Sequence, residues 1–107
     1  MPVDQGQLDQ ALTAMVRYAW LRTPPGARVL VQAAAATDVL KVRVADRGPD
    51  VAREAKPWLL ADPRRSGGGL QAAVRQLKAS GSGRITLEDN PAGGLVLVLA
   101  LSVATHG

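Results

Sequence analysis

The sequence lacks cysteine and phenylalanine, and its single histidine, His106, stands next to the last residue. Without cysteine there is no disulfide, no thiolate metal ligand and no cysteine nucleophile, which fits a reducing compartment. A histidine-based zinc site or a Ser-His-Asp triad would depend on one terminal imidazole, so both are excluded. Aromatic residues make up only 3% of the chain, and we therefore expect Val, Leu and Ala to fill the core.

Long apolar runs and basic runs are also missing. The longest apolar run, Leu95 to Leu101, is far too short to cross a bilayer, and the start MPVDQGQLDQ is too polar for a secretory signal. We therefore expect a cytoplasmic protein with no membrane contact by this chain. The net charge is +4, but the thirteen cationic residues are spread among acids without interleaved aromatics, which argues against nucleic-acid binding.

The length of 107 residues predicts one domain over residues 1–107. Hydrophobic periodicity predicts helices over 7–22 and 70–80, strands over 28–34, 39–46, 84–88 and 95–103, and one short helix within 51–60. Residues 95–103 are apolar on both faces, so this strand should lie centrally in its sheet. The order of elements predicts a two-layer α/β sandwich, with helices on one face of a mainly antiparallel sheet.

Two segments could carry chemistry. In the first, Asp46 follows a buried strand and precedes a Gly48-Pro49 turn. Its carboxylate could accept a hydrogen bond from an exocyclic amine such as that of adenine, and Gly48 would let a flat ring approach the backbone. The alternative interpretation is that Asp46 only caps the turn, as Asp often does.

The second segment, RRSGGGL, covers residues 64–70 and leads into a helix. Glycine N–H groups and the positive end of a helix together attract phosphate, and the two arginines could add charge-assisted bonds. A flexible connector has the same composition, and the segment does not match the P-loop pattern because no Gly-Lys-Ser/Thr follows.

Taken in order, three stretches resemble the ATP-binding catalytic domain of sensor histidine kinases, in the GHKL or Bergerat-fold ATPase superfamily. They are ALTAMVRYAWLRTPPGARVLV, VLKVRVADRGPDV and GGGLQAAVRQLKASGSGRITLEDNPAGGLVLVLAL, and together they cover about Leu8 to Leu101. The resemblance implies a Bergerat-like fold of three helices over a mixed, mainly antiparallel sheet of about five strands, with nucleotide between the first helix and a lid.

The resemblance also implies roles for individual residues. Asp46 would meet the adenine amine and Gly48 would let the ring sit close. The phosphates would be wrapped by the glycine-rich segment at the start of the second long helix, which comprises Gly67, Gly68, Gly69 and Leu70. Trp58 lies where the family often has an aromatic residue, and residues 63–65 resemble a basic lid.

The sequence departs from the family pattern where the family binds metal. The family's first helix carries two asparagines four residues apart, and the second usually holds Mg²⁺; Ala14 and Tyr18 stand at these positions. Neither side chain is a good ligand for a hard cation. Asp50 replaces the second glycine of the DxGxG turn. In the GxGLG motif, either Gln71 replaces a glycine or the register has slipped by one residue. We therefore assign no catalytic residue and no metal ligand, and we do not expect Mg²⁺ binding.

These matches and departures together predict a degenerate histidine-kinase-like domain in which ATP binding is weak or absent. It would act in signalling through partners such as a kinase dimerisation domain or a response regulator. The alternative is an active ATP-binding domain of a sensor histidine kinase or of an anti-sigma-factor-like kinase. A third hypothesis is a small scaffold or inhibitor that docks through Tyr18 and an exposed Trp20, although both rings could instead pack under the TPPG turn or the lid.

Overall fold

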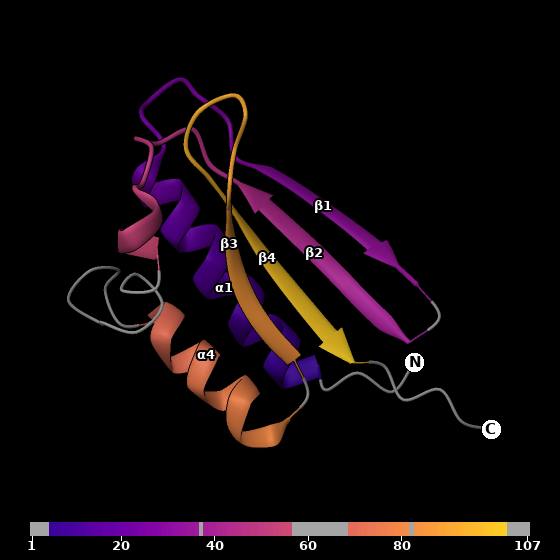
Figure 1. Cartoon of the computed structure of the whole chain (residues 1–107). Helices are drawn as coiled ribbons and strands as arrows, with labels where there is room; N and C mark the ends of the chain where they lie inside the picture. The colour runs from indigo at the N-terminus through magenta and orange to yellow at the C-terminus, as the bar shows by residue number, and fades with distance from the viewer. Residues whose placement is uncertain (1–4, 37, 57–68, 82, 103–107) are drawn as a thin grey trace.

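The computed structural model describes residues 5–36, 38–56, 69–81 and 83–102. These residues form two α-helices, one 3-10 turn and four strands (Figure 1). In chain order they are α1 (Gln5–Arg22), β1 (Leu30–Ala35), β2 (Val39–Ala45), η1 (Arg53–Ala55), α4 (Gly69–Ser80), β3 (Gly83–Asp89) and β4 (Leu95–Ser102). The predicted long helices and the four strands are confirmed, with bounds that shift by one or two residues at most ends. Of the short helix expected within 51–60, the described part contains only η1.

The strands form one sheet in the order β1-β2-β4-β3, and every neighbouring pair is antiparallel. The strand over 95–103 was expected to lie centrally, and β4 does lie between β2 and β3. The resemblance implied about five strands, three helices and a mixed sheet, whereas the described residues show four strands, two α-helices and no parallel pair. The pairs β1–β2 and β3–β4 are hairpins, so each is antiparallel. β3 follows α4 in the chain and lies on the side of β4 that faces away from β2.

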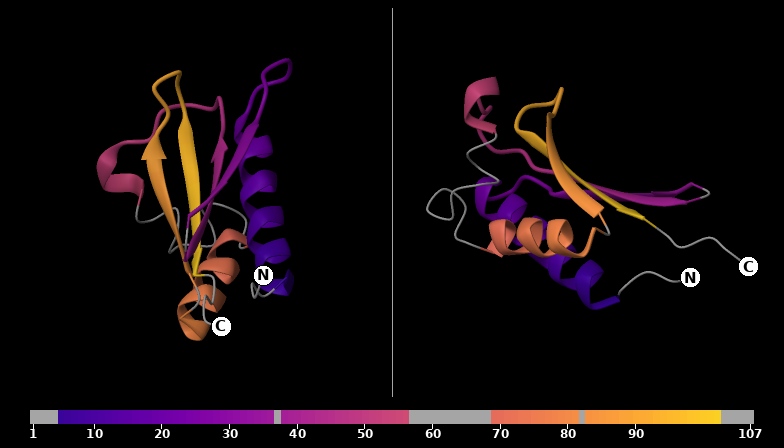
Figure 2. Two further views of the ribbon diagram at one scale, coloured as in Figure 1. Left: turned by 90° about the vertical axis from the view of Figure 1, so that its right-hand side faces the viewer. Right: turned by 60° about the horizontal axis from the view of Figure 1, so that its bottom comes forward.

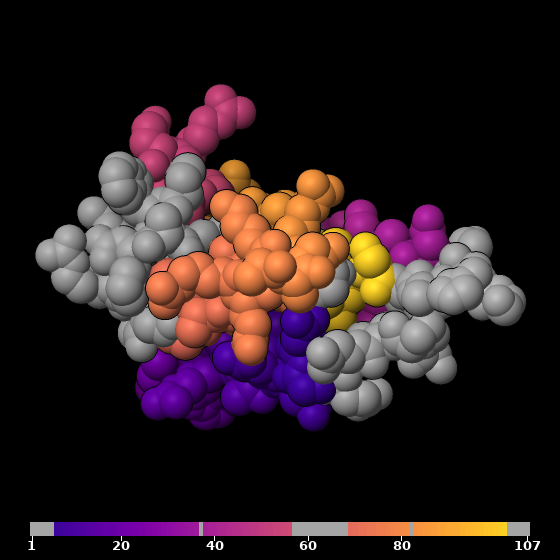
Figure 3. Space-filling view, turned by 90° about the horizontal axis from the view of Figure 1, so that it is seen from below, coloured from indigo at the N-terminus to yellow at the C-terminus, as the bar shows by residue number. Residues whose placement is uncertain are grey.

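The two helices cover one face of the sheet, as predicted. α1 packs against β2 and β4 and also against α4, which in turn packs against β3. The turned views place α1 and α4 on the same face, and the view from below shows them side by side (Figures 2 and 3). α1 therefore lies toward the β2 side of the sheet and α4 toward the β3 edge.

The core lies between the helices and the inward face of the sheet. Along β2, Val42 and Val44 are buried while Lys41 and Arg43 are exposed, which is the alternation expected of a strand with one covered face. Fully buried aliphatic side chains come from every layer: Met15, Leu70, Leu77, Leu95, Leu97, Leu99 and Leu101. Each contributes about 1.5–3 kcal/mol on burial, so this aliphatic core can stabilise the domain without phenylalanine.

Candidate functional site

Asp46 is the residue that follows β2, and its side chain is completely buried. Its backbone N–H donates to the Leu95 carbonyl at 2.9 Å, so it continues the pairing with β4. One carboxylate oxygen, Oδ1, accepts hydrogen bonds from two backbone N–H groups, that of Gly48 at 3.0 Å and that of Leu95 at 2.9 Å. Asp46 therefore holds the start of β4 and the turn after β2 together.

The other carboxylate oxygen is bound by Arg22, the last residue of α1. The Arg22 Nε donates to Asp46 Oδ2 at 2.6 Å, its Nη2 donates to the Pro49 carbonyl, and its guanidinium lies 5.8 Å from the centre of the Tyr18 ring. The Arg22 side chain is only 14% exposed. Both oxygens of the Asp46 carboxylate thus have protein donors. The bond from Arg22 is charge-assisted, and such bonds are stronger than those between neutral groups.

Gly48 lies against the end of α1. A Cβ at this position would come within 2.6 Å of the Arg22 carbonyl oxygen and 2.9 Å of the Arg22 Cβ. Because the clash would involve backbone atoms, a glycine is needed here for the packing of the chain itself. The predicted role of Gly48, the close approach of a flat ring, stays a prediction beside this packing role.

The β3–β4 turn completes the surroundings of Asp46. Asn90 Nδ2 donates to the Asp46 carbonyl at 2.9 Å, and a Cβ on Gly94 would collide with Asp46 Oδ1. Asp50 Oδ1 accepts the Gly94 N–H at 2.9 Å, so Asp50, which stands where the resemblance expects a second glycine, caps this turn. Figure 1 shows that this turn and the end of α1 lie at the same end of the molecule.

Arg22 and the DNPAGG turn were not predicted from the sequence as parts of this cluster. Arg22 ends the helix just before TPPG, and Asn90 and Gly94 belong to a turn that was identified only as a break between strands. Their positions in the sequence gave no signal for the contact, because Arg22 and Asp46 are 24 residues apart.

Tyr18 and Ala14 occupy the two α1 positions where the resemblance expects asparagine. Tyr18 is 7% exposed and belongs to the core. Burial raises the pKa of its phenol above the usual value, although the positive charge of Arg22 opposes the shift. The phenol therefore stays neutral at ordinary pH. Because Tyr18 is buried, it is not available to the docking face that the third hypothesis assigned to it together with Trp20, which is exposed as predicted.

The predicted phosphate segment is described only at its end. Gly67 and Gly68 lie outside the described residues, as do Trp58 and residues 63–65. Gly69 is exposed at the start of α4, where a Cβ would meet Ala14 at an ordinary 3.9 Å, and Leu70 is buried in the core. The structure thus brings Gly69 beside α1, while Leu70 has a packing role.

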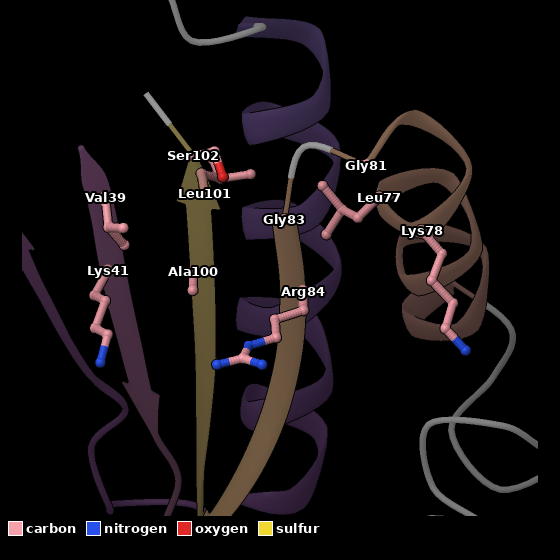
Figure 4. A pocket seen from close by; sticks show the side chains of 10 residues that line it. All are labelled: Val39, Lys41, Leu77, Lys78, Gly81, Gly83, Arg84, Ala100, Leu101 and Ser102. Carbon is pink, nitrogen blue, oxygen red and sulfur yellow. The ribbon is translucent and has the colours of Figure 1, made fainter. Parts of the chain in front are cut away.

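Among the hollows lined by described residues are three of about 420–470 Å³, and Asp46 does not line any of these three. One of about 420 Å³ lies between α1 and α4, beside Ala14 and Gly69. A second, of about 470 Å³, lies at the opposite end of β2 from Asp46 (Figure 4). There Lys41, Lys78 and Arg84 surround an apolar floor, and Arg84 extends from β3 toward β4 while Lys78 points away from the strands.

In the part of the chain that the structure describes, no group of three or more His, Cys, Asp or Glu side chains is placed to hold a metal ion. Among the same residues, no helix has both the length and the apolar character needed to cross a membrane.

Comparison with solved structures finds the same fold in histidine kinases. The nucleotide-free catalytic domain of histidine kinase ThkA superposes with a TM-score of 0.80 at 19% identity, over 96% of this chain and 70% of that one. The mycobacterial sensor histidine kinase MprB superposes with a TM-score of 0.79 at 23% identity, over 97% of this chain and 75% of that one.

Full-length ShkA in complex with AMPPNP matches with a TM-score of 0.75 at 27% identity, over 97% of this chain and 23% of the ShkA chain. No protein-family model and no curated protein sequence matches. The chain therefore has the fold of the catalytic ATP-binding domain of histidine kinases, and the resemblance inferred from its motifs is confirmed at the level of the fold.

Proposed function

We propose that this chain is a histidine-kinase-like domain of signal transduction whose nucleotide site is degenerate, so that ATP binding is weak or absent and the domain works through protein contacts. The fold and the ATP-analogue complex of ShkA support the kinase-like part of the proposal. The observation that carries the degenerate part is the occupation of the Asp46 carboxylate by Arg22.

An acceptor for the adenine amine needs a free lone pair that faces the ligand. Asp46 Oδ1 already accepts two backbone N–H groups, and Oδ2 accepts the Arg22 Nε at 2.6 Å. Oδ2 keeps one further lone pair, but the side chain is completely buried, so we expect that a purine has to move the guanidinium before its amine can reach this oxygen. Separating a pair with one fully buried member costs about 3 kcal/mol, which weakens binding by roughly 100-fold.

The residues of α1 also do not fit Mg²⁺. The position where the family's second asparagine is expected holds Tyr18, whose buried phenol has a raised pKa and stays neutral, and Ala14 has no ligand atom. Mg²⁺ prefers carboxylate and carbonyl oxygens in octahedral geometry. Phosphoryl transfer depends on a metal that neutralises the γ-phosphate, so we derive no phosphoryl-transfer step for this chain.

Protein contacts take the place of catalysis in this proposal. The partners would be cytoplasmic signalling proteins, such as a kinase dimerisation domain or a response regulator. Trp20 and Leu21, at the end of α1, are 67% and 72% exposed and support contact with another protein there, because large exposed apolar side chains mark interaction sites.

The test is a calorimetric titration with a non-hydrolysable ATP analogue, with and without Mg²⁺, on the wild-type chain and on Asp46→Asn and Arg22→Met. We expect absent or weak binding that Mg²⁺ does not change, and tighter binding in Arg22→Met, because that variant removes the competing guanidinium. Arg43→Met is the matched control, since it removes an arginine from an exposed ion pair on β2.

The opposite result would favour the active alternative. Micromolar binding that requires Mg²⁺ and disappears in Asp46→Asn would show that the carboxylate serves the nucleotide rather than the fold.

A further inference from the structure

Among the described strands, β1 lies at one margin of the sheet and has no charged side chain. β1 is the last strand in the order β1-β2-β4-β3, and no described strand pairs with its outer edge. All six of its residues, LVQAAA, are exposed, and none is charged or proline. Unpaired N–H and C=O groups on such an edge are a template for another strand.

The opposite edge of the sheet is β3, and charged side chains protect it from pairing. β3 carries Arg84, Glu88 and Asp89. Both acids form ion pairs, Glu88 with Arg43 at 2.8 Å and Asp89 with Lys56 at 2.7 Å. Charged side chains on an edge strand prevent pairing with a second chain. β1 has no such protection and instead exposes Leu30 by 55% and Val31 by 46%.

The hairpin fixes which backbone groups of β1 are free. The Ala36 N–H donates to the Val39 carbonyl at 2.8 Å, in the same register that pairs Leu30 with Ala45. Because hydrogen-bonding direction alternates along an antiparallel strand, the even-numbered residues bond to β2. The N–H and C=O groups of Val31, Ala33 and Ala35 therefore point to the free edge.

We propose that a second copy of this chain pairs with this edge, antiparallel and centred on Ala33. In this register Ala33 lies opposite the partner's Ala33, and Val31 lies opposite the partner's Ala35, so every pair joins residues whose free groups face each other. About six backbone hydrogen bonds would join the two sheets into one of twice the width. The small side chains at the seam allow close approach.

Charge complementarity selects this register and this occupant. Arg28 precedes β1 and Asp38 lies in the hairpin turn that follows it; both are exposed, and neither forms an ion pair with another described residue. Pairing centred on Ala33 brings Arg28 to the turn that holds the partner's Asp38, and symmetry repeats the contact. An unrelated strand would have to supply both charges independently.

The same pairing would also cover an apolar surface of α1. Antiparallel pairing of two copies about an axis perpendicular to the sheet places both helix layers on one face. α4 lies toward the β3 edge, so the flank of α1 that faces away from α4 is on the β1 side (Figure 2). This flank carries Leu12, Val16 and Trp20, which line an apolar hollow of about 430 Å³ that the second copy would cover.

The test is sedimentation velocity on the whole chain across a concentration series. We expect a reversible dimer with a Kd on the order of 10–100 μM, because the interface is small. Ala33→Pro removes an N–H that the β1–β2 ladder does not use, and it should weaken the dimer by roughly tenfold or more. Arg84→Asp, on the opposite edge, is the matched control and should leave the dimer intact.

A charge swap tests the register without proline. Arg28→Asp alone and Asp38→Arg alone should each weaken the dimer, and the double variant should restore it. A wild-type chain that stays monomeric up to about 1 mM overturns the proposal. A dimer that is indifferent to Ala33→Pro and to the single charge reversals overturns it as well. Arg22→Met should not change the dimer, so the outcome is independent of the proposed nucleotide site.

Discussion

Replacing Arg22 with Met is the sharpest perturbation of the cluster around Asp46. The substitution removes the Nε–Oδ2 bond of 2.6 Å and the bond to the Pro49 carbonyl, and it leaves a completely buried carboxylate with two backbone donors. Breaking a buried pair by removing one partner costs about 3–5 kcal/mol. Because the Arg22 side chain is 14% exposed, water can reach the vacated space, and we expect a loss of about 2–4 kcal/mol.

Urea unfolding followed by circular dichroism measures this loss, and the melting temperature should fall by about 5 °C for each kcal/mol. Arg43→Met is the control, because it breaks an ion pair whose side chains are 44% and 51% exposed and should cost at most about 1 kcal/mol. A double-mutant cycle of Arg22→Met with Asp46→Asn should return a coupling energy of about 2 kcal/mol or more. If Arg22→Met costs no more than Arg43→Met, the pair does not organise this end of the fold.

Three other substitutions probe the same cluster. Gly48→Ala should destabilise the domain by about 2 kcal/mol or more, because the new Cβ meets the Arg22 backbone; an unchanged unfolding midpoint would show that the turn can move aside. Burial raises the Tyr18 pKa above 10, so folding favours the neutral phenol and its contribution to stability is lost as pH rises above 10; Tyr18→Phe should flatten that decline, and equal alkaline unfolding curves would contradict it. Asp50→Ala should cost about 1 kcal/mol by freeing the Gly94 N–H, and a hydrogen-exchange rate of that amide that does not change would contradict the cap.

Local patterns in the sequence were enough to predict the two α-helices and four strands that the structure describes. The alternation along 39–46 identified a strand with one covered face, and the doubly apolar stretch from Leu95 identified a central strand, because burial on one or both faces leaves a direct record in residue type. The resemblance implied about five strands and three helices. The described residues hold four strands and two α-helices, and residues 57–68 lie outside them.

The candidate site could be predicted only in part. A carboxylate after a buried strand marked Asp46 as unusual, and it is indeed buried. Its partner could not be found from spacing, because Arg22 reaches it through the packing of α1 on the sheet, which no local pattern encodes. If Asp46 binds adenine, its hydrogen-bond donor is the ligand; if it caps the turn, its donors belong to the protein itself. Which donors face the carboxylate depends on the three-dimensional arrangement, which no local pattern encodes.

The central claim is that the Asp46 carboxylate is committed to the protein's own donors. The amides of Gly48 and Leu95 both donate to Oδ1 and therefore report directly on it. In an ¹⁵N-resolved spectrum recorded during addition of an ATP analogue with Mg²⁺, we predict that these two resonances stay in place. The claim would be contradicted if both resonances shift, if the shifts saturate with nucleotide and if they require Mg²⁺. Such shifts would place a ligand at the carboxylate to which Arg22 is bound in the structure.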